Sequence, residues 1–409
     1  MTARIVSIGE YVDVVSGPAF KSDQFTDDTE NIPLIKGENI GQGFIVWEKS
    51  KYWPRSDAES YERFALDAGD IVVAMDRPWV TAGLKWARLK QHEPRSLLVQ
   101  RVARLRAENG LLQDYLTYVI GSTPFCDHVR NIMGGTNVPH ISGAQIKAFK
   151  FRLPEEHEQT AIADILLAYD EMIENNRRRI ALLEEAARLL YREWFVHFRF
   201  PGHEHVKIID GRPEGWEVGP IMKSYLGLFD GPHATPAPSN EGPVFLGIQN
   251  VREQGGIDLS NIRHVSEVEF PKWTRRVMPR EGDIVFSYEA TLNRYALIPR
   301  GLRCCLGRRM ALIRPKEEYR FFLYLHFLSE DWRRVIASKV MIGATVDRVP
   351  LTSFPDFPIL LPSQKIAAAF RDEVAAHFKL IECLTEQNQK LAKARDLLLP
   401  RLMNGEIAV

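Results

Sequence analysis

The sequence is short of cysteine, has no long apolar run and carries no net charge. Its four cysteines, Cys126, Cys304, Cys305 and Cys383, match no zinc-binding spacing, so we expect reduced thiols in a cytoplasmic protein. No apolar run approaches the roughly 18 residues that a membrane span needs. The N-terminus lacks the pattern of a secretion signal, so we expect no membrane contact. Lys+Arg and Asp+Glu number 53 each, which argues against a uniformly basic surface but leaves room for local basic patches.

The motifs of cofactor-dependent and ATP-driven enzymes are also missing. There is no glycine-rich cofactor loop after a strand, no Asn/Asp-Pro-Pro-aromatic loop of the amino-methyltransferase kind, and no Gly-x-x-x-x-Gly-Lys-Ser/Thr phosphate loop. His203 and His205 suggest a metal, but no third ligand stands at a telling spacing, which favours an exposed linker. We therefore expect no catalytic residue, no metal and no cofactor, and favour a binding protein over a methyltransferase or nuclease.

The chain is organised as an internal repeat. The run Gly69–Val72 (Gly-Asp-Ile-Val) returns as Gly282–Val285, 213 positions later, and Pro154 is matched by Pro362, 208 positions later. Further matches follow in the same order at nearly the same offset. A repeating unit of about 200 residues is far longer than a solenoid repeat. The pattern therefore indicates two whole domains plus a shared accessory element.

A long helix is predicted after each of the two matching prolines. Residues 155–198 contain neither Gly nor Pro, and apolar residues recur there at steps of three and four, as they do after Pro362. Each helix of about 35–40 residues would be about 50–60 Å long. Neither can bury its apolar stripe alone, so we expect an antiparallel coiled coil. Asn176 and Asn388 either specify its register or are ordinary polar residues at the edge of the seam. The stripes are Ile162, Ile165, Tyr169, Met172, Ile180, Leu183, Ala187, Leu190 and Trp194, and Phe370, Val374, His377, Ile381, Leu384, Leu391 and Leu398.

The regions outside these helices mix strand-like and helix-like runs. Strands are predicted at Asp70–Ala74, Ser96–Leu105, Asp283–Ser287 and Met310–Ile313, and helices at Leu111–Ile120 and Arg320–Ile336. Each region is therefore predicted to be a compact α/β domain. The whole chain is then an α+β protein with a pseudo-two-fold internal repeat.

A basic segment stands at the same place in both repeats. Residues 85–106 contain seven basic residues against the single acid Glu93, and residues 293–314 contain six basic residues and no acid. In a chain without net charge, this pattern indicates a surface that faces phosphates. Solvated charges at strand edges are the alternative, and the sequence leaves both open. Two similar domains on a stiff helical pair also suit duplex DNA, which has local two-fold symmetry.

The segments after the two Gly-Asp-Ile-Val strands are candidates for reading bases. Arg77 in the first half and Arg294 in the second are of a type that pairs with guanine, and Asn293 and Gln249 are of a type that pairs with adenine. Each could equally serve to form a turn. The candidate DNA-binding residues are Lys36, Asn39, Arg77, Trp79, Lys85, Arg101, Arg104, Gly135, Thr136, Asn137, Gln249, Asn250, Arg252, Tyr288, Asn293, Arg294, Arg308, Arg309, Thr345 and Arg348.

The layout resembles the specificity subunit of type I restriction-modification systems over nearly the whole chain. Beside the two Gly-Asp-Ile-Val repeats, the resemblance rests on Glu171–Arg178, on Pro213–Trp216 and on the C-terminal Ala394–Ile407. One departure is that Gly343 is followed by alanine, where the loop of the first half has a double glycine. The resemblance implies target recognition domains at 1–153 and 201–361, and long spacer helices, the conserved regions, at 154–200 and 362–409.

The resemblance also implies a non-catalytic subunit that works with partners. Each domain would read half of a bipartite asymmetric site in double-stranded DNA. The helices would dock two methyltransferase subunits, and the assembly would include restriction/translocase subunits. The alternative is a non-catalytic coiled-coil adaptor that binds proteins rather than DNA. Salt-dependent binding to duplex DNA separates the two, because phosphate contacts weaken steeply with salt.

Overall fold

The computed structural model describes residues 4–80, 83–132, 139–341 and 346–409. Contacts divide the chain into unit 1, which consists of Met1–Glu174 and Asn388–Val409, and unit 2, which consists of Asn175–Gln387. There are two 40-residue helices, α5 (Glu156–Phe195) and α9 (Gln364–Met403). Each of them has one end in unit 1 and the other end in unit 2. The two predicted long helices are therefore present. The predicted domain boundaries follow the ends of these helices, whereas the contacts assign half of each helix to each unit.

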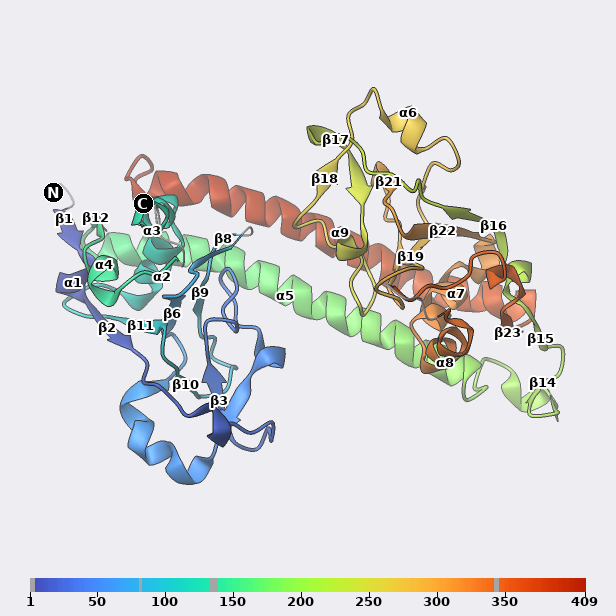
Figure 1. Cartoon of the computed structure of the whole chain (residues 1–409), viewed down its shortest axis with the longest axis horizontal. Helices are drawn as coiled ribbons and strands as arrows, with labels where there is room; N and C mark the ends of the chain where they lie inside the picture. Colours follow the sequence, from blue (N-terminus) through green and yellow to red (C-terminus); the bar gives the residue numbers. More distant parts are fainter. Residues whose placement is uncertain (1–3, 81–82, 133–138, 342–345) are drawn as a thin grey trace. The chain divides into compact units, whose positions relative to one another are not determined.

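Unit 1 contains two four-stranded sheets, and the one nearer to α5 is antiparallel (Figure 1). The strand order of this nearer sheet is β2 (Val12–Ser16), β11 (Val102–Ala107), β6 (Ile71–Ala74), β9 (Trp86–Arg88). The second sheet has the order β4 (Lys51–Trp53), β3 (Ile32–Ile35), β10 (Ser96–Leu98), β5 (Ala65–Leu66). The other elements are β1 (Arg4–Ser7), α1 (Ile8–Tyr11), β7 (Trp79–Val80), β8 (Gly83–Leu84), α2 (Gln113–Gly121), α3 (Thr123–Ile132), α4 (Gly143–Lys147) and β12 (Lys150–Leu153).

Unit 2 repeats this plan. Its first sheet has the order β16 (Tyr225–Asp230), β22 (Met310–Pro315), β19 (Ile284–Ser287), β20 (Tyr295–Leu297), and its second has β18 (Arg263–His264), β17 (Ser239–Leu246), β21 (Cys304–Leu306). The other elements are β13 (Ile208–Ile209), β14 (Arg212–Pro213), β15 (Glu217–Pro220), α6 (Phe270–Trp273), α7 (Arg320–Phe327), α8 (Glu330–Lys339) and β23 (Pro358–Leu361). In both units the third strand of the first sheet, β6 or β19, carries the Ile-Val of the repeated motif.

Two predicted elements are interrupted in the structure. The expected strand Ser96–Leu105 is divided, because β10 ends at Leu98 and β11 begins at Val102. The expected helix Arg320–Ile336 is divided into α7 and α8. The hydroxyl of Ser329 accepts a hydrogen bond from the backbone N–H of Trp332 at 3.2 Å, which caps the start of α8 and explains the break.

The aspartate of the repeated motif has the same structural role in both units. Asp70 accepts two hydrogen bonds from the guanidinium of Arg106, at 2.5 and 2.7 Å, and Asp283 accepts two from Arg314, at 2.9 and 2.8 Å. The Asp70 and Asp283 side chains are 5% and 2% exposed. Each pair joins the turn before the third strand to the neighbouring strand of the same sheet, so the motif identifies the fold rather than a reactive site.

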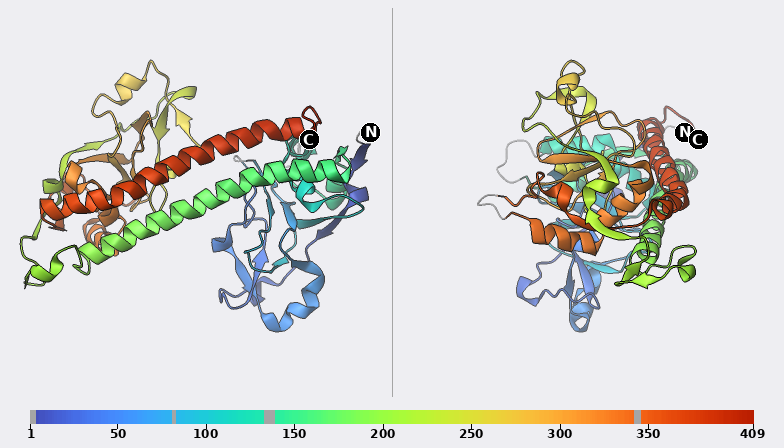
Figure 2. Two further views of the ribbon diagram at one scale, coloured as in Figure 1. Left: turned by 180° about the vertical axis from the view of Figure 1, so that it is seen from behind. Right: turned by 90° about the vertical axis from the view of Figure 1, so that its right-hand side faces the viewer.

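In unit 1, the first half of α5 packs antiparallel to the end of α9 (Figure 2). Ile162 and Leu166 share a buried cluster with Leu402. The guanidinium of Arg395 donates to Asp170 at 2.5 Å, and the side-chain amide of Asn388 donates to a backbone carbonyl of α5 at 3.3 Å. Part of the predicted stripe was wrong here: Ile165 and Met172 are 36% and 44% exposed, since Leu166 and Ile173 face inward instead.

In unit 2, the second half of α5 packs antiparallel to the start of α9. The rings of Trp194 and Phe370 lie 5.4 Å apart, in an aromatic core that also holds Phe195. The side-chain amide of Asn176 donates to that of Gln387 at 3.1 Å. Asn176, which was predicted to lie in the seam, is therefore hydrogen-bonded across it. This favours a role in setting the register of the two helices over an ordinary polar position at the edge of the seam.

Candidate nucleic-acid interface

One end of the first sheet in unit 1 is formed by three chain segments, which we call rim 1: Met75–Arg77, Arg101 and Pro139–Ile141. Met75 donates its backbone N–H to the carbonyl of Arg101 at 2.8 Å, and Ile141 donates to Met75 at 2.8 Å. Arg77 in turn donates to Pro139, also at 2.8 Å. The end of β6 is thereby joined on one side to the β10–β11 turn and on the other to the segment before α4.

Unit 2 contains the same arrangement, rim 2, formed by Tyr288–Ala290, Arg309 and Asp347–Val349. The backbone N–H of Tyr288 donates to Arg309 at 3.2 Å, that of Val349 to Tyr288 at 2.7 Å, and that of Ala290 to Asp347 at 3.0 Å. These residues stand at the repeat offsets from their counterparts in rim 1. The two rims are therefore equivalent in backbone structure, although their side chains differ.

Both rims hold residues in the left-handed backbone region. Arg77 and Arg101 have φ values of 44° and 65° in rim 1, and Ala290 and Arg309 have 70° and 72° at the equivalent positions of rim 2. A residue with a side chain adopts this conformation at a cost of about 1–3 kcal/mol, and such residues cluster at functional sites. The repetition of this strain in both units makes the rims candidates for a ligand-binding surface.

An acid lies at the centre of each rim. In rim 1, Asp76 forms an ion pair with Arg101 at 2.9 Å, and its Oδ1 is hydrogen-bonded to Nδ1 of His140 at 2.5 Å. In rim 2, Glu289 forms an ion pair with Arg309 at 3.1 Å. Arg348 pairs with Glu289 through the backbone, as His140 does with Asp76. Sequence reasoning selected Arg101, Arg309 and Arg348 but missed the two acids, although the 213-position offset between them was a usable signal.

Three basic candidates of unit 1 lie close together beside rim 1. Burial lowers the pKa of Lys85, and the charges of Lys49 and Arg77 lower it further. Lys36 forms an ion pair with Glu38 at 2.5 Å, and its hydrogen bond is the main cause that lowers the pKa of Glu38. Three lysines act on the Glu38 carboxylate, and Arg77 acts on one of them, Lys85, which gives a local positive field in a chain with no net charge.

Trp79 extends the basic surface of unit 1. It lies in the hairpin formed by β7 and β8, and the guanidinium of Arg130 is 4.4 Å from the centre of its ring. Trp79 is partly exposed. A half-exposed ring beside a guanidinium provides a flat surface for stacking or for contact with an apolar base edge.

The candidates of unit 2 include polar atoms that are buried but have no partner. Within the described residues, these atoms include the hydroxyl of Tyr288, Oδ1 of Asn293 and Nε of Arg294. The Nη1 of Arg294 donates to the carbonyl of Val251 at 2.8 Å. That bond places the loop that follows β17 next to rim 2. Unsatisfied buried polar atoms are uncommon in folded proteins and call for a partner, such as water or a ligand.

The remaining candidates differ in their placement. Gln249, Arg252 and Arg308 are exposed. Arg252 lies near Glu184 of α5. Burial raises the pKa of Glu184, and the positive charge of Arg252 lowers it. The charge of Arg252 therefore acts on the helix. The candidates Gly135, Thr136, Asn137 and Thr345 lie outside the described residues.

Known proteins with similar sequences include specificity subunits of type I restriction enzymes. Residues 2–185 match the family model described as type I restriction modification DNA specificity domain. The type I restriction enzyme MjaIX specificity subunit of Methanocaldococcus jannaschii is 26% identical over 319 residues, which are 74% of this chain and 71% of that protein. The MjaVIII specificity subunit of the same organism is 30% identical over 186 residues, 45% of this chain and 43% of that protein.

A solved structure shows the same fold. The crystal structure of the type I restriction-modification system S subunit from M. genitalium matches with a TM-score of 0.56 at 15% identity, over 98% of this chain and 99% of that chain. This chain is similar to the specificity subunits of type I restriction enzymes, and the matching family model covers residues 2–185. The resemblance seen in the sequence is confirmed. These relatives are named as specificity subunits, which agrees with the expectation of a non-catalytic subunit.

Three of the candidate residues have structural roles and are withdrawn as DNA contacts. Asn39 is fully buried, and its side chain accepts from the backbone of Lys36 at 3.0 Å. Asn250, its counterpart, accepts from Gly247 at 3.1 Å. Arg104 is 5% exposed and donates to backbone carbonyls and to an aspartate. Their polar groups are used within the fold, so they are not free to contact a base.

The two basic segments of the chain are not continuous cationic surfaces. Six of the seven basic residues in the first segment form ion pairs with acids, and three of the six in the second do so. Within the described part of the chain, four have no carboxylate at ion-pair distance: Lys85, Arg294, Arg300 and Arg308. The expectation of a phosphate-facing surface along both segments was too broad, because acids distant in sequence neutralise most of the charge.

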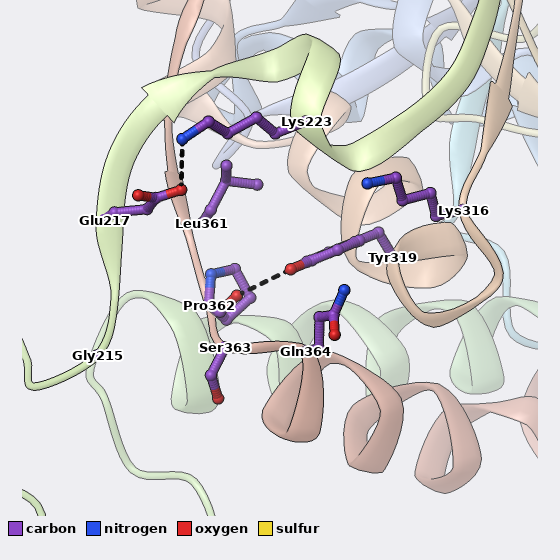
Figure 3. A pocket seen from close by; sticks show the side chains of 9 residues that line it. All are labelled: Gly215, Glu217, Lys223, Lys316, Tyr319, Leu361, Pro362, Ser363 and Gln364. Carbon is purple, nitrogen blue, oxygen red and sulfur yellow. Dashed lines mark hydrogen bonds and ion pairs between the residues drawn. The ribbon is translucent and has the colours of Figure 1, made fainter.

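A pocket of about 320 Å³ lies elsewhere in unit 2, at the start of α9 (Figure 3). Lys223 forms an ion pair with Glu217 at 2.8 Å in its wall, and the hydroxyl of Tyr319 donates to the carbonyl of Pro362 at 3.2 Å. None of the candidate DNA-binding residues that the structure describes lines it. Among the described residues, no group of three or more His, Cys, Asp or Glu is placed to hold a metal. No helix in that part of the chain is long and apolar enough to cross a membrane.

Proposed function

We propose that this specificity subunit recognises a bipartite, asymmetric site in double-stranded DNA, with rim 1 reading one half and rim 2 the other. The observation that carries the proposal is the repetition of the rims. Their backbone hydrogen bonds and left-handed residues are equivalent, whereas the side chains they present are not. Rigid backbone with variable side chains at one place suits a reader of different base sequences.

The asymmetry follows from particular positions. Rim 1 presents Arg77 where rim 2 has Ala290, and His140 where rim 2 has Arg348. Arginine pairs with the O6 and N7 of guanine in the major groove, while a small apolar residue contacts the methyl group of thymine. The two units therefore favour different half-sites. Lys85 and Arg308, which have no carboxylate at ion-pair distance among the described residues, are proposed to hold phosphates and so to fix the orientation of the duplex.

The long helices are proposed to hold the two readers apart and to dock partners. A helix of 40 residues is about 60 Å long, and duplex half-sites recur about 34 Å apart or at multiples of that distance. Outward from the packed seam, α5 exposes Ile165 and Met172 in unit 1, and Leu182 and Leu189 in unit 2. Each pair is spaced by seven residues, as one face of a helix requires.

These two exposed pairs are proposed to bind two methyltransferase subunits, one on each unit, and restriction/translocase subunits would join that assembly. Leu182 is 70% exposed and Leu189 is 49% exposed, which is a large apolar area for a helix surface in contact with water. The chemistry, including base flipping for adenine methylation, belongs to the partners. We place the assembly in the cytoplasm, where it meets chromosomal DNA.

Two measurements test the proposal. Mapping methylated adenines genome-wide in a host that carries the complete complex should reveal one split motif with unlike halves. The purified complex should bind a duplex containing that motif with an affinity that falls as salt rises, by a slope of about 0.9 per phosphate contact. Methylation without a split motif, or affinity independent of salt, would favour a protein-binding adaptor instead.

A further inference from the structure

We propose that Asp76 and Glu289 are specificity-determining residues, which suppress binding to the DNA backbone and thereby make affinity depend on the bases. This inference rests on the proposed function and names the residues that set its discrimination. Both acids stand at the centre of their rims, at equivalent positions of the repeat. Neither was selected as a DNA contact from the sequence, and an acid on a DNA-facing surface requires a physical reason.

The two partners of each rim ion pair are unequally exposed to solvent. The Arg101 side chain is 68% exposed, whereas its partner Asp76 is 27% exposed. In rim 2, Arg309 is 35% exposed and Glu289 is 20% exposed. In each pair the guanidinium is therefore freer to leave than the carboxylate. When a duplex approaches, the arginine can turn to the DNA, while the carboxylate stays on the rim.

The carboxylate discriminates between the two chemical faces of a duplex. Phosphate oxygens and ionised carboxylates are both hydrogen-bond acceptors and both negative, so they repel each other. The major groove instead offers donors, namely N4 of cytosine and N6 of adenine, and acidic side chains accept from the former. An acid on the rim thus weakens the binding of a duplex that is held only by its phosphates. It does not weaken the binding of a duplex whose bases donate a hydrogen bond to it.

The acid also competes for the arginine. In the free protein Asp76 neutralises Arg101, and Glu289 neutralises Arg309, so neither arginine adds fully to binding of an arbitrary sequence. A base edge that makes two hydrogen bonds to the guanidinium compensates for the lost ion pair better than a single phosphate contact does. The correct half-site gains more from each arginine than random sequence gains, and the difference is specificity.

The test uses Asp76→Asn and Glu289→Gln in the full chain, purified with its methyltransferase partners. The first probe is a duplex of random sequence, titrated over a range of salt. Each substitution frees one arginine for a phosphate, so the salt slope should steepen by about 0.9. The variant's affinity relative to the unsubstituted protein should then rise about eightfold for each tenfold drop in salt.

The second probe is the mapped site with single base changes in each half. Asp76→Asn should reduce discrimination in the half read by unit 1 alone, and Glu289→Gln in the other half alone. Glu62→Gln and Glu267→Gln are matched controls, because each removes a carboxylate from an exposed ion pair with Arg95 or Arg303 at the opposite end of β10 or β21. Both controls should keep the original slope. Asp76→Glu retains the charge and should also keep it, even if Asp76→Asn lowers stability.

The outcomes separate this inference from the proposed function. The complex could discriminate sequences while the variants bind random sequence with the affinity and salt slope of the unsubstituted protein. That result would overturn the role of the two acids and leave the proposed function standing. A slope that steepens equally in the two controls also overturns it, since any lost acid would then have the same effect. A complex without salt-dependent DNA binding overturns both.

Discussion

The hydroxyl oxygen of Tyr191 on α5 and Nδ1 of His326 on α7 lie 2.8 Å apart in the core of unit 2. Aromatic rings surround the imidazole, including Phe322 and Trp332. Burial lowers the pKa of His326 to about 4 and raises that of Tyr191. A neutral histidine is therefore part of the contact between α7 and the long helix α5 in unit 2.

This attachment makes the stability of unit 2 dependent on pH. In the unfolded chain His326 titrates near pH 6.5, so the full stability is present above that pH. As pH falls from about 6.5 towards 4, the unfolded state takes up the proton first, and the free energy of unfolding drops by up to about 3 kcal/mol. Urea unfolding of the full chain across this range should show the loss, and His326→Phe should flatten it. An equal pH dependence in that variant would assign the effect to other groups.

The motif aspartates should be important for stability rather than for DNA binding. Asp283→Asn removes the negative charge and one of the two acceptor oxygens that Arg314 uses, and should lower the free energy of unfolding by about 3 kcal/mol, with a smaller loss for Asp70→Asn because Arg106 is more exposed. The control is Asp67→Asn, whose exposed carboxylate should cost under about 1 kcal/mol. Thermal unfolding measures all three. If Asp283→Asn lowered the free energy of unfolding as little as the control does, the structural role of the motif aspartates would be contradicted.

Lys85 should contribute a phosphate contact, whereas Arg95 should not. Lys85 is the cation of the first basic segment that has no ion-paired carboxylate among the described residues, while Arg95 is engaged by Glu62 and Asp67. Lys85→Gln should reduce the salt slope for random-sequence duplex by about 0.9, and Arg95→Gln should leave it unchanged. Anisotropy titrations at several salt concentrations provide the slopes. If both substitutions changed the slope equally, ion pairing would not decide which cations meet DNA.

The exposed leucines of α5 should be needed for partner binding alone. The double variant Leu182→Gln with Leu189→Gln removes apolar contact area from the helix surface. Glutamine forms helices well, so the thermal stability of the chain should change little. Co-purification of the methyltransferase subunit should drop severalfold. Val268→Gln, at a site that is 90% exposed in the same unit, is the matched control. Undiminished co-purification of the double variant would exclude this face as the docking surface.

The long-range plan of the fold could be read from the sequence because it is carried by local patterns. The three-and-four periodicity predicted α5 and α9, and the repeat offset predicted two equivalent units. The break between α7 and α8 was missed, because a serine cap at Ser329 interrupts a continuous apolar pattern.

The candidate site was predicted less completely, because charge pairing depends on tertiary contacts. Arg104 and Arg106 look like free cations in the sequence, yet they meet Asp13 and Asp70 across the sheet. Asn39 has a side chain of a type that pairs with bases, but its amide oxygen accepts a hydrogen bond from the backbone of Lys36 within a turn. The left-handed φ of Arg101 and of Arg309 has no sequence signature, since neither is glycine or asparagine.

The most direct test of the two-reader account is a hybrid chain. Residues 1–153 are replaced by the corresponding domain of another specificity subunit, α5 and α9 are kept, and methylated adenines are mapped genome-wide in a host that carries the hybrid complex. The account predicts that one half of the split motif changes while the other half and the spacing remain. A change in both halves, or in neither, would contradict it.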